Sequence, residues 1–447
     1  MSDTTGNTRP RFFAGKLLLA GVVAGWLVTS ERIAQIAPET QTAILVGFVL
    51  VLFVFLSRSL YDRLAWTLAF QAFGMQHVPI AGIYVSLSDI MLAFLVVEAG
   101  LSPQLRRQKL SPMGALAIAL LVSTCISTIL SPVIAEILGV SVRYGILLLL
   151  FIALDRTEFS EETLDTTRYA LTFTLPVALI LLYFNGDLFK ILPALEAGER
   201  PIHSQTLPYL LSLMFPWYLL GHRGRIALIP LGLVFAAITW VGQSRAMVIV
   251  AYVTLLIVLF VRLKRNLSSL LVFVTVTVVG LLGFYSVTGS ANVADAMMAA
   301  RQDSDDWRRY KMQVSMESFG EHPIFGVGPG GEGGDAIRKH GEIMASENGL
   351  VQSLADSGLV GTTLFLVMLL YPARQCFRLA KRRVIGREFA GALMVIVVLT
   401  VAPLLSSSGA EGPTVWLLLV IANKHVRWAE SKTPIATAKV SVLPTPP

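Results

Sequence analysis

The sequence predicts an all-α fold: a polytopic transmembrane helical bundle of about 12–14 spans, with one large, partly helical loop outside the membrane. Two observations support this prediction. Of the 447 residues, 54% are hydrophobic and only 15% are charged, which is too little charge for the surface of a soluble protein. Apolar runs of helix length recur from Phe13 to Asn423 with a single long polar interruption. Disordered, collagen-like, disulfide-stapled and ordinary cytosolic proteins are therefore excluded.

The order of the apolar runs divides the chain into four segments. Residues 1–287 are expected to form the first eleven spans, 288–349 the large loop, 350–424 the last spans and 425–447 a tail. The first run resembles the start of a signal peptide, but it is expected to remain as an uncleaved helix. The spans are expected near residues 13–29, 41–57, 64–76, 79–99, 112–131, 133–154, 169–185, 207–221, 226–241, 246–262, 268–287, 350–371, 388–408 and 413–424.

The formal charge of +7 is distributed in short basic clusters beside the apolar runs, and this pattern indicates membrane orientation rather than a nucleic-acid partner. The positive-inside rule places the clusters at 106–109, 222–225, 262–265 and 374–387 in the cytoplasm. Each pair of clusters is separated by an even number of predicted spans. Both termini are therefore expected inside, and the 288–349 loop and the turn at 242–245 on the opposite side.

No metal site or cofactor is expected. Cys125 and Cys376 supply too few ligands for structural zinc, and both are expected to be free thiols.

The large loop contains ten Asp or Glu against six Lys or Arg. Its first half, Val293–Gly320, predicts a helix on which Arg308, Met312, Met316 and Phe319 share one stripe. Such a stripe suits a helix lying at the membrane surface, although a plain amphipathic cover helix fits the same pattern.

A glycine-rich run, HPIFGVGPGG at 322–331, follows this helix. Its glycines, Gly326, Gly328 and Gly330 among them, allow backbone N–H groups to approach an anion closely, as phosphate-binding loops do. The run lacks the Lys-Ser/Thr ending of a P-loop. A tight turn that lets the chain re-enter the bundle is the second interpretation of the same residues.

Three further positions are candidates for chemistry. Arg245, in a turn between apolar spans, fits either an anion clamp or an interfacial anchor. Glu347 and Asn348 begin the re-entering helix, where Glu347 fits a general base and the pair also fits a simple helix cap. His340 is a second candidate base.

The order of these motifs resembles the O-antigen ligase and polysaccharide polymerase superfamily over roughly residues 226–370. The resemblance rests on Ser244-Arg245 opening a span, on Arg308 before the 322–330 run, and on Glu347-Asn348 before Gly358. It implies a metal-independent glycosyltransferase at the periplasmic face of a bacterial inner membrane. Family members transfer a glycan from an undecaprenyl-pyrophosphate carrier to an acceptor sugar hydroxyl, which is on lipid A core for ligases and on another carrier-linked repeat unit for polymerases.

The resemblance implies roles for the candidate residues. Arg245 and Arg308 are expected to hold the pyrophosphate and Glu347 to act on the acceptor. The expected substrate contacts are Asn348, Arg309, His340, Gly326, Gly328 and Gly330.

One position departs from the ligases, which have a histidine where this chain has Glu347. A polymerase is therefore expected first and a ligase second. Two functions from different classes also fit a polytopic chain, namely a polysaccharide or lipid flippase and a non-catalytic assembly partner. A flippase and a chain-length regulator are expected as partner proteins.

Overall fold

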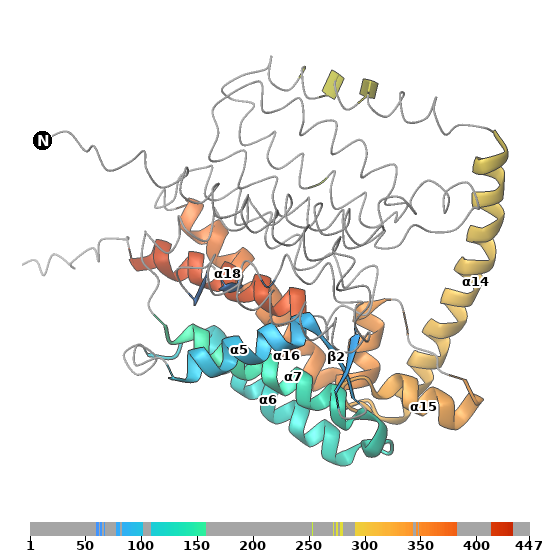
Figure 1. The fold of residues 1–447 in the computed structure, drawn as a ribbon, viewed down its shortest axis with the longest axis horizontal. Helices are drawn as coiled ribbons and strands as arrows, with labels where there is room; N and C mark the ends of the chain where they lie inside the picture. Colours follow the sequence, from blue (N-terminus) through green and yellow to red (C-terminus); the bar gives the residue numbers. More distant parts are fainter. Residues whose placement is uncertain are drawn as a thin grey trace, which may run out of the picture.

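The computed structural model describes residues 77–80, 83–101, 109–157, 291–342, 348–381 and 413–431, together with scattered positions at 60, 61, 63, 64, 67, 253, 271, 274, 275, 278, 279 and 346. These residues form helices and one small β-hairpin (Figure 1). The predicted all-α class is confirmed. Three of the described helices, α6 (Pro112–Leu130), α7 (Ile134–Asp155) and α16 (Gly349–Lys381), are long and apolar enough to cross a membrane.

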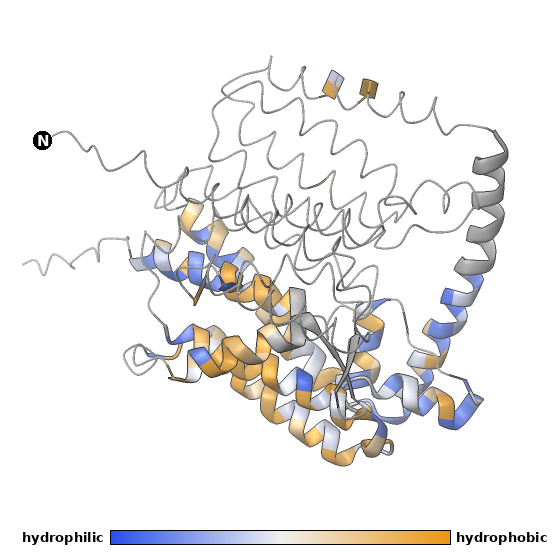
Figure 2. Cartoon of the chain, viewed as in Figure 1, coloured by the Kyte–Doolittle hydropathy of each residue, from blue (hydrophilic) through white to orange (hydrophobic). Residues whose placement is uncertain are grey.

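Helices α6 (Pro112–Leu130) and α7 (Ile134–Asp155) form an antiparallel hairpin and confirm the spans predicted at 112–131 and 133–154. The start of α6 is fixed by local chemistry. The Ser111 hydroxyl accepts a hydrogen bond from the Gly114 N–H at 3.1 Å, and Pro112 follows in the first turn, where its missing N–H has no cost. Figure 2 shows this hairpin as mostly hydrophobic, as expected for a membrane-spanning pair.

Helix α18 (Pro413–Ser431) packs on α7 and α16. Residues 415–426 are all buried, which explains why this helix is apolar around its whole circumference over most of that stretch. The Trp416 ring forms the centre of an aromatic cluster, with ring centroids 5.4 Å from Tyr144, 6.5 Å from Phe151 and 5.6 Å from Phe365.

Helix α16 (Gly349–Lys381) is broken at Gly358, whose φ of 61° and ψ of −167° are not helical. A short first part therefore precedes a long second part, which contains Pro372. The span predicted at 350–371 lies within α16 but ends ten residues before the helix does.

Helix α14 (Ala291–Glu321) confirms the helix predicted at Val293–Gly320 and runs along one edge of the molecule (Figure 1). It packs on α16 and on the short helix α15 (Gly331–His340). Val314, Ser315 and Ser318 form the buried side of α14, whereas Met312 and Met316 on the predicted stripe are about 40% exposed. These two methionines therefore face away from the described helices.

The helix predicted at 79–99 is wrong over its first residues. The strands β1 (His77–Ile80) and β2 (Ile83–Ser86) pair antiparallel there, and helix α5 (Leu87–Leu101) begins only after them. The β-branched residues Val78, Ile80, Ile83 and Val85 favour the hairpin over a helix.

The remaining predicted spans lie wholly or almost wholly outside the described residues, at 13–29, 41–57, 64–76, 169–185, 207–221, 226–241, 246–262, 268–287 and 388–408. The four segment boundaries of the chain stay predictions.

Candidate functional site

The glycine-rich run 322–331 is seated against the break in α16 through backbone hydrogen bonds. These bonds join two stretches of chain that are about 30 residues apart, and they run in both directions. The donors and acceptors are Val327 N–H to Ala355 O (2.9 Å), Gly328 N–H to Asp356 O (2.8 Å), Leu359 N–H to Pro323 O (2.9 Å) and Val360 N–H to Ile324 O (3.1 Å). The run is therefore part of the packed structure of α16.

The close approach explains why glycine occupies the contact positions. Gly326 has a φ of 70°, and a Cβ atom there would lie 2.4 Å from the carbonyl carbon of Asp356. The same holds on the other side of the contact, at Gly358. The N–H groups of Gly326 and Gly328 donate to carbonyl oxygens within the protein. This geometry accounts for the turn that lets the chain re-enter the bundle, and a substrate contact by Gly326, Gly328 or Gly330 stays a prediction.

Two serines at the end of α6 hold the carbonyl groups of this region. The Ser127 hydroxyl donates to the carbonyl oxygens of Phe325 at 2.5 Å and Asp356 at 3.1 Å. The Ser131 hydroxyl donates to the carbonyl oxygen of Val327. The glycine-rich run thus lies at the turn between α6 and α7, at one end of the hydrophobic hairpin.

Helix α15 places two buried carboxylates beside this region. Glu332, 1% exposed, accepts the Ser346 N–H at 2.9 Å, and its own N–H donates to the Asp356 carboxylate at 3.0 Å. Asp335, one turn later, accepts the Ser318 hydroxyl of α14 at 2.6 Å. The two acids therefore face different neighbours, one toward α16 and the other toward α14.

An ion-pair cluster fixes α15 on α14. Lys339 bridges Asp335 and Glu321 at 2.7 Å each, and Arg338 also pairs with Asp335 at 2.7 Å. Burial of Asp335 favours the neutral acid, but the hydrogen bonds from Lys339, Ser318 and Arg338 outweigh it and hold the pKa of Asp335 below its usual value. Desolvation likewise opposes the charge of Lys339, but the carboxylates of Asp335 and Glu321 outweigh it and raise its pKa.

Asn348 is the N-cap of α16. Its side-chain oxygen accepts the N–H groups of Leu350 at 3.0 Å and Val351 at 3.3 Å, and its own N–H donates to the Ser346 hydroxyl at 3.1 Å. The capping role considered for this position is confirmed for Asn348, and its contact with a sugar stays a prediction.

The structure places the other predicted site residues on α14 and α15. Arg308 is half-buried on α14, while its neighbour Arg309 is exposed and lies 3.8 Å from Asp306. His340, at the end of α15, contacts Glu317 of α14 at 3.3 Å. Arg245 and Glu347 lie outside the described residues.

Several residues of the region were missed by the sequence-based prediction. These are the acids and hydroxyls that hold it together: Glu332, Asp335, Asp356, Ser127 and Ser131. Two patterns point to them, namely an acid that directly follows a glycine-rich run and serines at the end of an apolar span.

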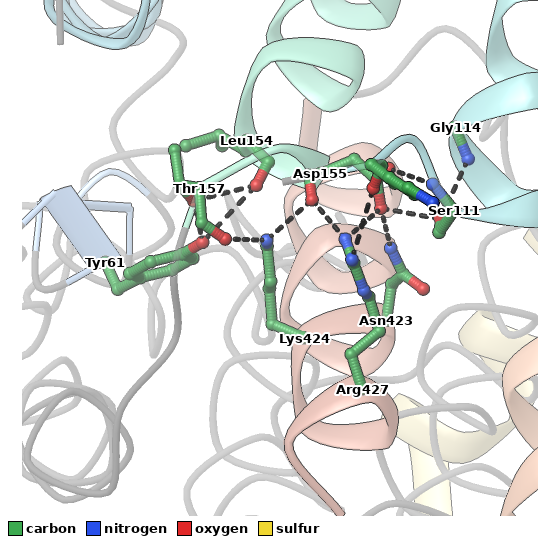
Figure 3. A network of polar contacts seen from close by, with 10 residues as sticks. Tyr61, Ser111, Gly114, Leu154, Asp155, Thr157, Asn423, Lys424 and Arg427 are labelled. Carbon is green, nitrogen blue, oxygen red and sulfur yellow. Dashed lines mark hydrogen bonds and ion pairs between the residues drawn. The ribbon is translucent and has the colours of Figure 1, made fainter. Parts of the chain in front are cut away.

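A second buried polar cluster lies at the opposite end of the α6–α7 hairpin (Figure 3). The Asp155 carboxylate at the end of α7 accepts the Ser111 hydroxyl at 2.6 Å and the Asn423 amide at 2.8 Å, and lies 3.3 Å from Arg427. Lys424, 1% exposed, donates to the carbonyl oxygens of Asp155 and Thr157. This cluster fastens α18 to the start of α6 and the end of α7.

No group of three or more His, Cys, Asp or Glu side chains in the described part of the chain is arranged to hold a metal ion.

The glycine-rich run, α15 and the first part of α16 fall within residues 230–366, which match the O-antigen ligase family model. Over this segment the chain is therefore similar to O-antigen ligases. This match confirms the resemblance to the O-antigen ligase and polymerase superfamily, and the matched segment includes positions 245, 308 and 347. A search of curated proteins finds no match to the chain. The matched segment thus contains α14, α15 and the first part of α16, together with Arg245 and Glu347, which lie outside the described residues.

Proposed function

We propose that the protein polymerises undecaprenyl-pyrophosphate-linked oligosaccharide repeat units into a surface polysaccharide, by glycosyl transfer at the periplasmic face of a bacterial inner membrane. The observation that carries this proposal is the O-antigen ligase match over residues 230–366. It favours glycosyl transfer over a flippase or an assembly partner. Polymerisation is preferred because Glu347 stands where ligases of the superfamily have a histidine, and transfer to lipid A core is the second candidate.

The proposed reaction is a displacement at the anomeric carbon of the donor sugar. The acceptor hydroxyl oxygen forms a bond to that carbon, the bond from the carbon to the pyrophosphate oxygen breaks, and the lipid pyrophosphate leaves with the electron pair. Glu347 takes the hydroxyl proton. No nucleotide is required, since the carrier linkage supplies the activated leaving group.

Electrostatic stabilisation of the leaving pyrophosphate is the largest contribution expected from the protein. Arg245 and Arg308 carry it, because a guanidinium is always charged and its planar fork matches phosphate oxygens. Arg309, Asn348 and His340 contact the glycans, and the glycine-rich run with Gly326, Gly328 and Gly330 borders the substrate.

The positions of the two polar clusters support the proposed sidedness. The Asp155 cluster and the glycine-rich run lie at opposite ends of α6, and a helix of 19 residues is about 28 Å long, close to the bilayer core of roughly 30 Å. Arg378 near the end of α16 lies 3.6 Å from Glu430 of α18, at the Asp155 end. Basic residues at that end suit the cytoplasm, and the termini are proposed to lie there too.

The test uses the purified full-length chain in proteoliposomes with an undecaprenyl-pyrophosphate-linked oligosaccharide and no other protein. The wild type is expected to lengthen the glycan, and Arg245→Ala is expected to abolish lengthening while the protein still inserts. Lys381→Ala, at the far end of α16, removes a cation outside the site and serves as the control. Normal lengthening by Arg245→Ala would remove Arg245 from the mechanism.

The same assay separates the candidate functions. A ligase transfers the glycan only when lipid A core is added, whereas a flippase or an assembly partner transfers nothing. A deletion strain adds an independent readout. If the strain loses the polymer but still attaches other glycans to lipid A core, the protein is a polymerase. Flippase and chain-length regulator proteins are proposed as partners in the cell, and the purified assay shows whether they are needed.

A further inference from the structure

We infer that Glu332 is a positioning residue for glycosyl transfer. It fixes the backbone on both sides of position 347, whose glutamate is proposed to take the acceptor proton. This inference rests on the proposed function for its catalytic meaning. Its structural basis is a set of hydrogen bonds that join α15 to the start of α16.

Glu332 is buried and accepts a hydrogen bond from a distant part of the chain. Only 1% of this residue is exposed, and a carboxylate in such a place is costly unless it is satisfied by hydrogen bonds or charges. Its Oε1 atom accepts the N–H of Ser346 at 2.9 Å across 14 residues of chain. A buried acid that accepts a backbone N–H from a distant segment holds that segment in place.

Ser346 in turn holds the start of α16. Its hydroxyl accepts the N–H of Asn348 at 3.1 Å, and Asn348 caps α16. Ser346 and Asn348 are the two neighbours of position 347 in the sequence, and consecutive Cα atoms are only about 3.8 Å apart. The chain is therefore held immediately before and immediately after the residue proposed to take the acceptor proton.

The backbone of Glu332 is anchored on the other side, at the break in α16. Its N–H donates to the Asp356 carboxylate at 3.0 Å, and the Asp356 carbonyl accepts the Gly328 N–H at 2.8 Å. Glu332 thus connects the Ser346 segment to the break in α16 and to the glycine-rich run. The hydrogen bond to Ser346 requires an acceptor atom at the length of a glutamate side chain, and it does not require a charge.

Two substitutions at position 332 separate the effect of side-chain length from the effect of charge. Glu332→Gln keeps the acceptor oxygen and loses the charge, whereas Glu332→Asp keeps the charge and is one methylene shorter. A purely electrostatic role predicts that Asp is tolerated and Gln is not. The positioning role predicts the reverse order.

The experiment measures hydrogen exchange of the Ser346 amide and glycan lengthening in the full chain reconstituted in lipid. Glu332→Asp is expected to make Ser346 exchange about tenfold faster and kcat about tenfold lower, because one buried hydrogen bond is lost. The KM for the donor is expected to stay within about twofold of the wild-type value. Glu332→Gln is expected to stay within about threefold of the wild type in both readouts. Asp335→Asn, which alters the buried acid facing α14, is the matched control and should leave Ser346 exchange unchanged.

Unchanged Ser346 exchange in Glu332→Asp would overturn the inference, and so would Glu332→Gln being the more impaired variant. The exchange readout needs no substrate. If exchange follows the expected pattern and the wild type fails to lengthen glycan, the result counts against the proposed function, and the positioning of Ser346 by Glu332 stands.

Discussion

A Cβ atom on Gly358 would lie only 2.3 Å from the carbonyl oxygen of Ile324, so the backbone of the broken helix α16 touches the backbone of the glycine-rich run. Gly358 also has a positive φ of 61°, which other residues rarely adopt. The contact therefore requires glycine for both space and backbone conformation.

Replacing Gly358 with alanine is expected to destabilise the protein by about 3 kcal/mol, from backbone strain together with the steric overlap at Ile324. The measurement is thermal unfolding in detergent. Gly320→Ala on α14 is the control, because nothing lies within 4 Å of a Cβ there and a helical alanine is favoured over glycine. Equal melting temperatures for Gly358→Ala and the wild type would show that this contact does not contribute to stability.

Ser127→Ala is expected to lower stability by about 1–3 kcal/mol, because the Phe325 and Asp356 carbonyls lose a buried donor. Ser123 is the matched control. It is buried one turn earlier on α6, and its hydroxyl has no hydrogen-bond partner in the described structure. Ser123→Ala should therefore be neutral or slightly stabilising. The prediction fails if the two variants unfold at the same denaturant concentration.

Removing the carboxylate of the second cluster is expected to cost about 3–5 kcal/mol, because Asp155→Ala leaves Arg427 and Asn423 without their acceptor and the buried charge of Lys424 without a nearby negative charge. Unfolding can be followed by intrinsic tryptophan fluorescence, to which the buried Trp416 contributes. Adding Lys424→Met to Asp155→Ala should recover part of the loss, since the buried charge is then removed as well. Asp306→Ala on the exposed surface of α14 is the control and should have little effect.

Acidification is expected to loosen α15 from α14 through Asp335. The folded pKa of Asp335 is lower than its ordinary value of 3.8, so the carboxylate contributes stability that is fully present above that pH and is lost as the pH falls through the folded pKa. Thermal unfolding of the wild type should therefore occur at lower temperatures as the pH falls from about 4 to the folded pKa. Asp335→Asn should flatten this part of the pH profile, and an unchanged slope in that variant would assign the loss to other groups.

The sequence predicted the α6–α7 hairpin and α14 nearly to the residue, because apolar runs and a 3.6-residue stripe are local properties of the chain. It failed at residues 79–86, where a run of suitable hydropathy contains β-branched residues that pair as strands. Hydropathy alone does not distinguish the two structures at that length.

The candidate site was predictable only in part. The glycine-rich run stood out by composition, and its partner did not, because the contact between Gly326 and Asp356 depends on how α16 breaks and folds back. In the sequence, Glu332 was marked only by its position directly after this run. Its importance comes from burial and from the Ser346 N–H, which are properties of the packed chain.

Backbone hydrogen bonds in both directions join the 322–331 run to the residues on the two sides of Gly358. We therefore expect the 322–331 run and the break in α16 to move together. A tilt of the long second part of α16 would then also move the glycine-rich run, beside which the sugars are proposed to react.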